Sequence, residues 1–273
     1  MKTLRRLRCL TITAISTALI FLAAPTIWAE DHGEEEIPFS EAEIFFELNN
    51  SDGDLGIHSA IDGGPWKRLS IEDTRERRML NINVRGRLRR QGLTQLFFES
   101  AEPVFDELPP AVFFNRFPEG EYEVDGVTLD GQELESVTEL THLMPAAPHA
   151  TVNMAPLAVV CDEDDADYDA PSVSTPITIS WPDVDHSHMT LGSPLNSEDI
   201  VIHNYEVVIE TDLELADGEE LTVKSSTILP PGVTSYVVPD GFIALSDVWK
   251  YEVLAREESY NQTAVESCFE IAD

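Results

Sequence analysis

The sequence predicts an all-β protein built from two antiparallel β-sandwich domains in tandem, with one short helix in the first domain. Many short segments alternate apolar and polar residues, turn-forming residues separate them, and a proline-containing break divides them into two groups. The stretch Phe242–Arg256 shows the alternation clearly. Tyr251, Val253 and Ala255 fall on one face at period two, as in a half-buried strand.

Residues 1–29 have the pattern of a secretory signal peptide. A basic segment precedes an apolar run from Leu10 to Ala24, and the small residue Ala29 marks the expected cleavage site. We therefore expect an exported protein, periplasmic or extracellular, that begins with a flexible acidic leader over residues 30–39. The rest of the chain has no apolar stretch of the roughly 20 residues that a membrane-spanning helix needs, so we expect no membrane span in the mature chain.

The chain is strongly acidic. It has 17 basic against 51 acidic residues, a formal net charge of -34. Removal of the four basic residues of the signal peptide leaves 13 − 51 = −38. Such a surface repels nucleic acid, which we exclude as a partner. Solvation, a halophilic (salty) environment, cation binding and a basic partner all remain open as explanations of the charge, and we expect salt to raise thermal stability.

The first domain is expected over residues 40–143. Asp130-Gly131 between two alternating strands is the strongest hairpin signal, and a helix is predicted over Leu108–Phe117, which has prolines at its start. The predicted strands are Glu43–Leu48, Leu55–Ile61, Trp66–Glu72, Arg78–Arg85, Thr94–Glu99, Gly120–Leu129 and Glu133–His142.

Residues 144–149 contain two prolines and several small residues, which predicts a semi-rigid linker. The second domain follows over residues 150–273. Seven strands in a segment of this length are typical of an immunoglobulin-like sandwich. They are Val152–Val160, Ile177–Trp181, Ile200–Thr211, Leu221–Ile228, Ser235–Val238, Tyr251–Arg256 and Thr263–Ile271.

The second half resembles a fibronectin type III domain from about residue 145 to 273. The resemblance is carried by Ile177-Thr178-Ile179-Ser180-Trp181, Tyr205-Glu206-Val207 and Leu245 followed by Tyr251-Glu252-Val253. It implies that Trp181, Tyr205 and Leu245 are core residues and that Tyr251 forms a tyrosine corner. The long Pro182–Asp199 connection, the acidic insertion Asp162–Asp169 and Trp249 depart from the family pattern. The first half resembles no family.

Cys161 and Cys268 are the two cysteines that remain after processing, and we expect them to form a disulfide. An exported protein meets an oxidising compartment, where an even pair favours a disulfide over free thiols or a metal site.

Two acidic segments are candidate calcium sites. Asn50, Asp52 and Asp54 alternate in a turn, so their oxygens can converge on a hard cation. A polar hairpin turn that uses Asn, Asp and Gly is the favoured explanation, and the spacing is not that of an EF-hand. The second segment concentrates six carboxylates beside Cys161, whose repulsion a bound Ca²⁺ would relieve; a solvated loop is the other interpretation. Its residues are Asp162, Glu163, Asp164, Asp165, Asp167 and Asp169.

Other constellations are weaker. His186 and His188 can face the same way on an extended segment and chelate a metal, but two histidines do not complete a site. No activated serine or cysteine motif is present. Because the chain has 51 acidic residues, no carboxylate pair stands out as a catalytic pair for glycoside hydrolysis. Glu99 and Glu102 are the best candidates, and we interpret them as sheet-edge residues.

We therefore expect a non-catalytic binding, adhesion or scaffold protein of the cell envelope or exterior, without a cofactor other than calcium. Its partner would be a protein or glycan at the cell surface, and self-assembly through sheet edges is possible. The alternative is a cation-stabilised carbohydrate-binding module that uses aromatic rings, and the third choice is a hydrolase. The candidate stacking rings are Trp66, Tyr122, Trp249 and Tyr260.

Overall fold

The computed structural model describes residues 36–272, so the expected signal peptide and the first part of the leader lie outside the described residues. The described chain is mostly β, as predicted. Its helices are all short: α1 (Leu88–Gln91), α2 (Pro110–Arg116) and α3 (Asp240–Ile243). The helix predicted over Leu108–Phe117 is confirmed as α2, whose Pro110 occupies a position where a missing N–H costs nothing. The prediction of one helix in the first half is wrong in number, because α1 is a second one there.

The two strands predicted over Leu55–Ile61 and Trp66–Glu72 form a single strand, β2. The segment between them, Asp62-Gly63-Gly64-Pro65, is not a turn, because β2 continues through it with a shift in register between Asp62 and Trp66. Before the shift β2 pairs with β1, and after it with β3 and β5, while β4 pairs with β2 mainly before the shift and once after it, at Trp66 and Leu93. The irregularity therefore redirects one long strand. The strands are β1 (Glu41–Asn49), β2 (Asp54–Glu72), β3 (Arg78–Asn83), β4 (Leu93–Glu99), β5 (Gly120–Thr128) and β6 (Glu133–Leu140).

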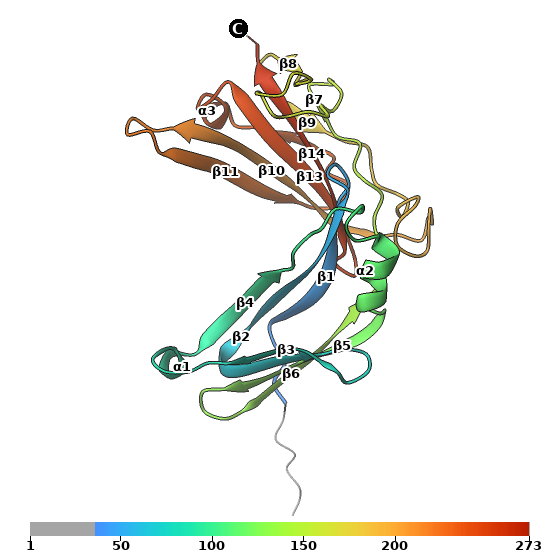
Figure 1. The fold of residues 1–273 in the computed structure, drawn as a ribbon, viewed down its shortest axis with the longest axis vertical. Coiled ribbons are helices and arrows are strands. Elements are labelled where there is room, and N and C mark those ends of the chain that lie inside the picture. The colour runs from blue at the N-terminus through green and yellow to red at the C-terminus, as the bar shows by residue number, and fades with distance from the viewer. Residues whose placement is uncertain (1–35, 273) are drawn as a thin grey trace, which may run out of the picture. The chain divides into compact units, whose positions relative to one another are not determined.

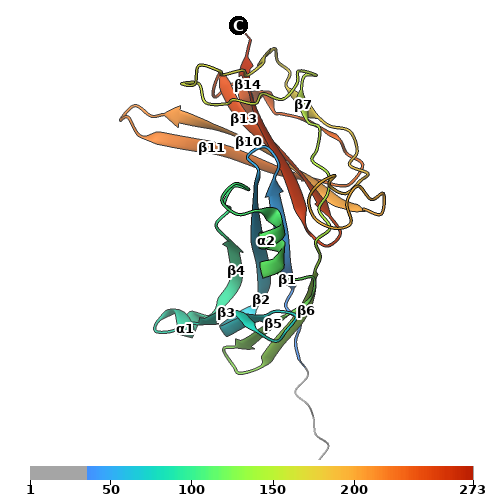
Figure 2. The same ribbon diagram turned by 45° about the vertical axis from the view of Figure 1, so that its right-hand side comes forward.

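The core of the first half lies between the bent sheet and α2, which runs alongside β1 and β2 (Figure 2). The rings of Phe113 and Phe114 contact Phe46 of β1 edge-on at 5.7 and 5.3 Å between centroids. The end of the expected flexible leader is also part of this fold. Ile37 donates its N–H to the Glu133 carbonyl at 3.1 Å, and Phe39 is buried in the core.

The second half packs a three-stranded sheet, in the order β12-β9-β7, against the strands β11-β10-β13-β14. The strand predicted over Val152–Val160 is wrong beyond its first residue, because only Thr151–Val152 form a strand, β7, and a loop follows. The strands are β7 (Thr151–Val152), β8 (Ser172–Val173), β9 (Thr178–Ser180), β10 (Ile202–Glu214), β11 (Glu220–Leu229), β12 (Ser235–Val237), β13 (Val248–Glu257) and β14 (Gln262–Ile271).

One eleven-stranded sheet runs through both halves, because β1 pairs with β14 over Glu47–Asn49 and Gln262–Ala264 (Figure 1). This pairing is parallel, as is that of β8 with β14, so the expectation of purely antiparallel sheets is wrong at these two places.

Asn261 fixes this junction. Its buried side chain accepts the Phe46 N–H at 2.8 Å and donates to the Thr141 and Leu143 carbonyls at 3.0 Å each. One amide therefore satisfies backbone groups from β1 and from the segment that follows β6.

Residues 144–149, expected to be a spacer, are largely packed against the rest of the fold. Met144 is buried, the Pro145 carbonyl accepts the Thr263 hydroxyl at 2.7 Å, and the Met144 carbonyl accepts the His188 N–H at 2.7 Å. These contacts hold the segment against the start of β14. No helix within residues 36–272 has the length and apolar character required to cross a membrane.

Candidate functional site

One face of the large sheet gathers acidic side chains from four strands around a histidine from a fifth. Alternate residues of a strand share a face, and directly paired residues on neighbouring strands lie side by side. Glu252 of β13 pairs with Glu266 of β14, and His58 of β2 pairs with Glu99 of β4. Glu47 of β1 lies between these pairs, opposite Gln262 on one side and Gly56 on the other. We call Glu47, His58, Glu99, Glu252 and Glu266 the acidic face.

His58 lies at the centre of the first-half part of this face. It is 4% exposed, and its Nε2 lies 2.8 Å from Glu102 Oε1, while its Nδ1 lies 3.6 Å from Glu47 Oε2. Burial acts to lower the pKa of His58, but the hydrogen bond to Glu102 and the charges of Glu47, Glu102 and Glu99 outweigh it, so the pKa is raised. Phe45 and Phe97 flank the ring at 5.4 and 6.2 Å.

Gly56 makes room for Glu102. A Cβ at position 56 would overlap the Glu102 carboxylate, so only glycine lets this side chain cross β2 to reach His58. The segment that carries Glu102 is held to β2 on both sides. Ser100 donates its N–H to the Ile57 carbonyl at 3.1 Å, and Phe105 donates to the Gly53 carbonyl at 2.9 Å.

Asp54 stands at the start of β2, on the same side of the strand as Gly56 and His58. Its Oδ1 atom is buried and has no hydrogen-bond partner among the described residues. Burial, followed by the charges of Glu102, Asp52 and other carboxylates, raises the pKa of Asp54 to about 6.

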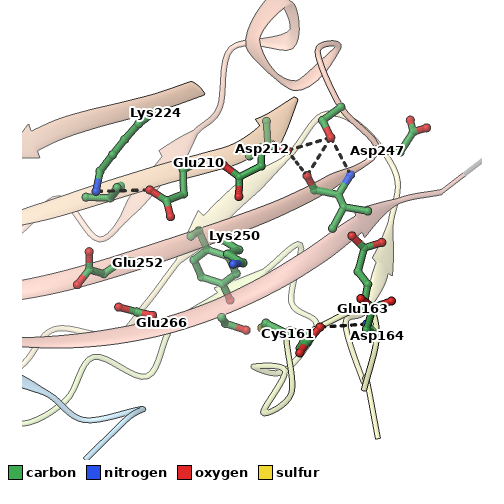
Figure 3. Close-up of a pocket in the computed structure, with 17 residues that line it drawn as sticks. Cys161, Glu163, Asp164, Glu210, Asp212, Lys224, Asp247, Lys250, Glu252 and Glu266 are labelled. Carbon is green, nitrogen blue, oxygen red and sulfur yellow. Dashed lines mark hydrogen bonds and ion pairs between the residues drawn. The ribbon is translucent and has the colours of Figure 1, made fainter. Parts of the chain in front are cut away.

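The second-half part of the acidic face borders a groove of about 980 Å³ (Figure 3). The loop around Cys161 and strands β10, β11, β13 and β14 line it. Lys224 Nζ lies 3.5 Å from Glu210 Oε2 on its wall. Burial, then the charges of Glu47 and Glu266, raise the pKa of Glu252 to about 8. The groove is therefore an acidic environment in which burial and neighbouring carboxylates disfavour the ionised form of Glu252.

The predicted site residues of the first acidic segment are dispersed. Asn50 places its Oδ1 3.2 Å from His188 Nε2, and Asp52 accepts a hydrogen bond from the Asn49 amide at 3.4 Å. Asp54 and Asp52 both lie near carboxylates of the acidic face, because, after burial, the charge of Glu102 raises the pKa of Asp54 and that of Asp52 raises the pKa of Glu266. A calcium ion bound jointly by Asn50, Asp52 and Asp54 stays a prediction.

The second acidic segment uses several carboxylates to cap its own backbone. Asp162 and Asp165 accept the N–H groups of Asp164 and Asp167 at 3.0 and 2.9 Å, and Asp169 accepts two N–H groups, those of Val159 and Val160, at 2.8 Å each. These are turn contacts of the kind that aspartate makes without a metal. Calcium binding by Asp162, Asp164, Asp165, Asp167 and Asp169 remains an untested expectation.

The disulfide predicted between Cys161 and Cys268 is present, with 5.7 Å between the Cα atoms. It fixes the acidic loop to β14, at the edge of the groove. The two loop histidines do not converge on a shared ligand. His186 Nδ1 lies 2.6 Å from Asp185 Oδ1, whereas His188 Nδ1 accepts the Leu191 N–H at 3.0 Å.

Three of the four predicted core residues are buried: Trp181, Tyr205 and Tyr251. Leu245 is 48% exposed, so its assignment to the core is wrong. Leu245 follows the single turn of α3, and its backbone N–H donates to the Phe242 carbonyl at 3.1 Å. Phe242, and not Leu245, packs against the core.

Tyr251 does not form the expected corner, because its buried hydroxyl makes no hydrogen bond to a backbone group among residues 36–272, and the polar side chain that acts on it is that of Ser267, the paired residue on β14. The hydroxyl of Tyr122, in the other half, donates to the Pro118 carbonyl at 3.0 Å, and that of Tyr205 accepts the Val184 N–H at 2.9 Å.

The rings considered for sugar stacking are mostly in the cores. Trp66, Tyr122 and Trp249 are fully buried, and the Tyr260 ring is covered by the Arg256 guanidinium at 4.9 Å. These positions remove the basis on which a carbohydrate-binding module was considered.

Sequence reasoning missed the role of His58 and Gly56 because nothing near them in the chain marks a site. Glu99 and Glu102 were singled out as a pair, and the structure brings both to His58. The structure brings them together through strand register, because His58 of β2 pairs directly with Glu99 of β4, and no local pattern in the sequence indicates this pairing.

No protein-family model and no curated protein matches the chain. Among solved structures it is similar to "Biofilm associated protein - BSP domain", with 10% identity and a TM-score of 0.23 over 86% of this chain and 30% of that one. It is also similar to "Crystal structure of tetra-tandem repeat in extending region of large adhesion protein", with 10% identity and a TM-score of 0.23 over 85% of this chain and 49% of the other.

A third similar structure, "Human OSCAR ligand-binding domain", is 10% identical with a TM-score of 0.23, covering 85% of this chain and all of that one. The chain thus spans 30% and 49% of the length of the first two. Because these TM-scores are low, we base no functional argument on the likenesses.

Proposed function

We propose that the protein is an exported, non-catalytic binding or scaffold module that engages a protein partner of the cell envelope or exterior by strand addition. The observation that carries this proposal is the edge strand β11, which ends the large sheet and pairs only with β10 among the described strands. A ten-residue edge presents a row of unpaired backbone donors and acceptors on which an extended segment can add.

The side chains of β11 suit such an addition. Thr222, Ser226 and Ile228 are exposed on the outer side, with Ile228 at 66%. Lys224, the one basic residue of the strand, is placed beside Glu210 at 3.5 Å, so it does not leave an isolated positive charge along the edge. Proline, which blocks edge pairing in many proteins, does not occur within the strand.

Charge indicates what kind of segment would add. The chain carries a formal net charge of -34, so two copies meeting edge to edge would repel each other. An extended segment that carries basic residues would be attracted to the same edge. We therefore infer a basic strand of another protein as the occupant, in preference to self-assembly.

Export is supported by the basic and apolar pattern of residues 1–29 and by the Cys161–Cys268 disulfide, which suits an oxidising compartment. A fibronectin type III-like architecture for residues 150–273, after the linker at 144–149, is supported by two facing sheets and by a Trp181–Tyr205 contact of 5.4 Å between ring centroids. Residues 40–143 would form the first domain.

Proline substitution tests the strand-addition proposal. Of two successive residues in an edge strand, one directs its N–H outward, where proline removes no bond to the neighbouring strand. We would make Ser225→Pro and Ser226→Pro, select the folded variant by circular dichroism, and measure retention on an envelope preparation from the organism that makes the protein. Ser226→Ala, which keeps the backbone N–H, is the matched control.

We expect the wild type and Ser226→Ala to be retained on the envelope preparation, and the amount of the folded proline variant that is retained to be at least tenfold lower. Unchanged retention of the folded proline variant would show that β11 is not the binding edge. Dimers or larger species of the free wild type in light scattering would show that a second copy occupies the edge.

A further inference from the structure

We propose that His58, Glu99 and Glu102 form a binding site for a divalent transition-metal ion of the Zn²⁺ class. Each of the three offers one ligand atom, and these atoms lie within 4.8 Å of one another. In the part of the chain that the structure describes, this is the one group of three or more histidine, cysteine, aspartate or glutamate ligands that converges in this way. The proposal does not depend on strand addition at β11.

The backbone holds the three ligands in place. His58 and Glu99 are directly paired across β2 and β4, so their side chains emerge side by side from a rigid sheet. Glu102 comes from the segment after β4 and crosses over Gly56, where a Cβ would block it. Ligands positioned by packed strands need little reorganisation when an ion binds.

A second observation points to a cation at this place. The buried Oδ1 of Asp54 lacks a partner among the described residues, although buried carboxylate oxygens are normally hydrogen-bonded. Asp54 stands on the same side of β2 as His58, and among its charged neighbours Glu102 has the largest effect on its pKa. A cation bound beside Glu102 would offset the repulsion between Glu102 and Asp54.

The donor set selects the class of metal. Ca²⁺ and Mg²⁺ take oxygen ligands, whereas a histidine nitrogen with carboxylate oxygens suits Zn²⁺ and its first-row neighbours. Glu99 is exposed while His58 is buried, so one side of the site opens to solvent. A water molecule or a partner's side chain can complete the coordination there.

The competing explanation is a simple ion pair. His58 in its protonated form would satisfy Glu102 at 2.8 Å and Glu47 at 3.6 Å without any metal. Glu99 separates the two explanations, because it forms no hydrogen bond or ion pair with a described residue, so an ion pair at His58 does not require it.

We would strip the full-length mature protein of metal with a chelator and titrate it with Zn²⁺ by calorimetry, following the melting temperature in parallel. Glu99→Gln is the test variant, since it is exposed and should leave the metal-free fold unchanged. Glu121→Gln, at an exposed position of β5, is the matched control. Histidine side-chain NMR signals report which of the seven imidazoles responds.

We expect one Zn²⁺ ion per chain, a rise in melting temperature, a shift of the His58 signal, and affinity at least tenfold weaker in Glu99→Gln but unchanged in Glu121→Gln. The proposal is overturned by the absence of heat and of any melting shift, or by binding that survives Glu99→Gln while the His186 or His188 signals move. Stabilisation by Ca²⁺ but not by Zn²⁺ would equally overturn the class of metal.

Discussion

The two acidic regions of this protein are built in opposite ways. In the loop from Asp162 to Asp169 the carboxylates are neighbours in the sequence, and several turn back to accept N–H groups of their own segment. On the acidic face the carboxylates are far apart in the sequence, and strand register brings them against one another, as with Glu252 and Glu266.

The difference shows that density of charge along a chain does not measure how strongly the charges interact. Exposed loop carboxylates are solvated and can move apart. Strand-borne carboxylates are held in place by the backbone. Burial first, and then the charges of neighbouring carboxylates, raise the pKa values of Glu47 and Glu252, which are partly buried, and of Glu266, which is more exposed.

The largest effect is expected from the covalent anchor of the loop. Replacing both Cys161 and Cys268 by serine should lower the free energy of unfolding by about 4 kcal/mol, because the bond closes a loop with a sequence separation of 107. Urea unfolding measures the change, and wild type in reducing agent should reproduce it. A loss below about 1 kcal/mol would mean that contacts other than the disulfide hold the loop.

The next effect concerns Glu252, which faces Glu47, Glu266, Glu206 and Lys224. Its pKa rises from 4.5 to about 8 on folding, so the folded state binds more protons between these values and stability falls as pH increases through them. Glu252→Gln should therefore stabilise the protein at pH 9, by about 2 to 4 kcal/mol, and much less at pH 4.

Urea unfolding at both pH values checks the Glu252 prediction, with the exposed Glu258→Gln as the control. Equal stabilisation at pH 4 and pH 9 would show that the gain comes from packing and not from an unfavourable buried charge.

The contrast also explains which features could be predicted from the sequence. Alternation along single segments identified the strands around Tyr251 and the hairpin at Asp130-Gly131, since these depend on residues close in the chain. The continuation of β2 through Gly63-Gly64-Pro65 could not be predicted, because it depends on which strands pair on each side. The meeting of His58 with Glu99 is likewise a matter of register between distant segments.

Salt should change stability through the acidic face but not through the acidic loop. Raising NaCl to 1 M shortens the Debye length to about 3 Å and screens the repulsion among strand-borne carboxylates, so we expect a gain of about 1 to 2 kcal/mol in wild type. Glu266→Gln should reduce the salt-dependent gain, and Asp164→Asn in the loop should leave it unchanged. Melting curves at several NaCl concentrations measure this, and equal effects of the two variants would remove the distinction.

The smallest effect is expected at Tyr251, where a sequence pattern predicted a hydrogen bond that depends on contacts between distant segments. Tyr251, whose sequence context predicted a hydroxyl bonded to the backbone, has no such bond, whereas Tyr122 donates to the Pro118 carbonyl at 3.0 Å. Tyr251→Phe should therefore change the free energy of unfolding by no more than about 0.5 kcal/mol, while Tyr122→Phe should cost about 1 to 2 kcal/mol because it leaves a carbonyl unpaired. Urea unfolding of the two variants compares them directly. A loss at Tyr251 as large as that at Tyr122 would mean that its hydroxyl is bonded in solution and that the predicted corner exists.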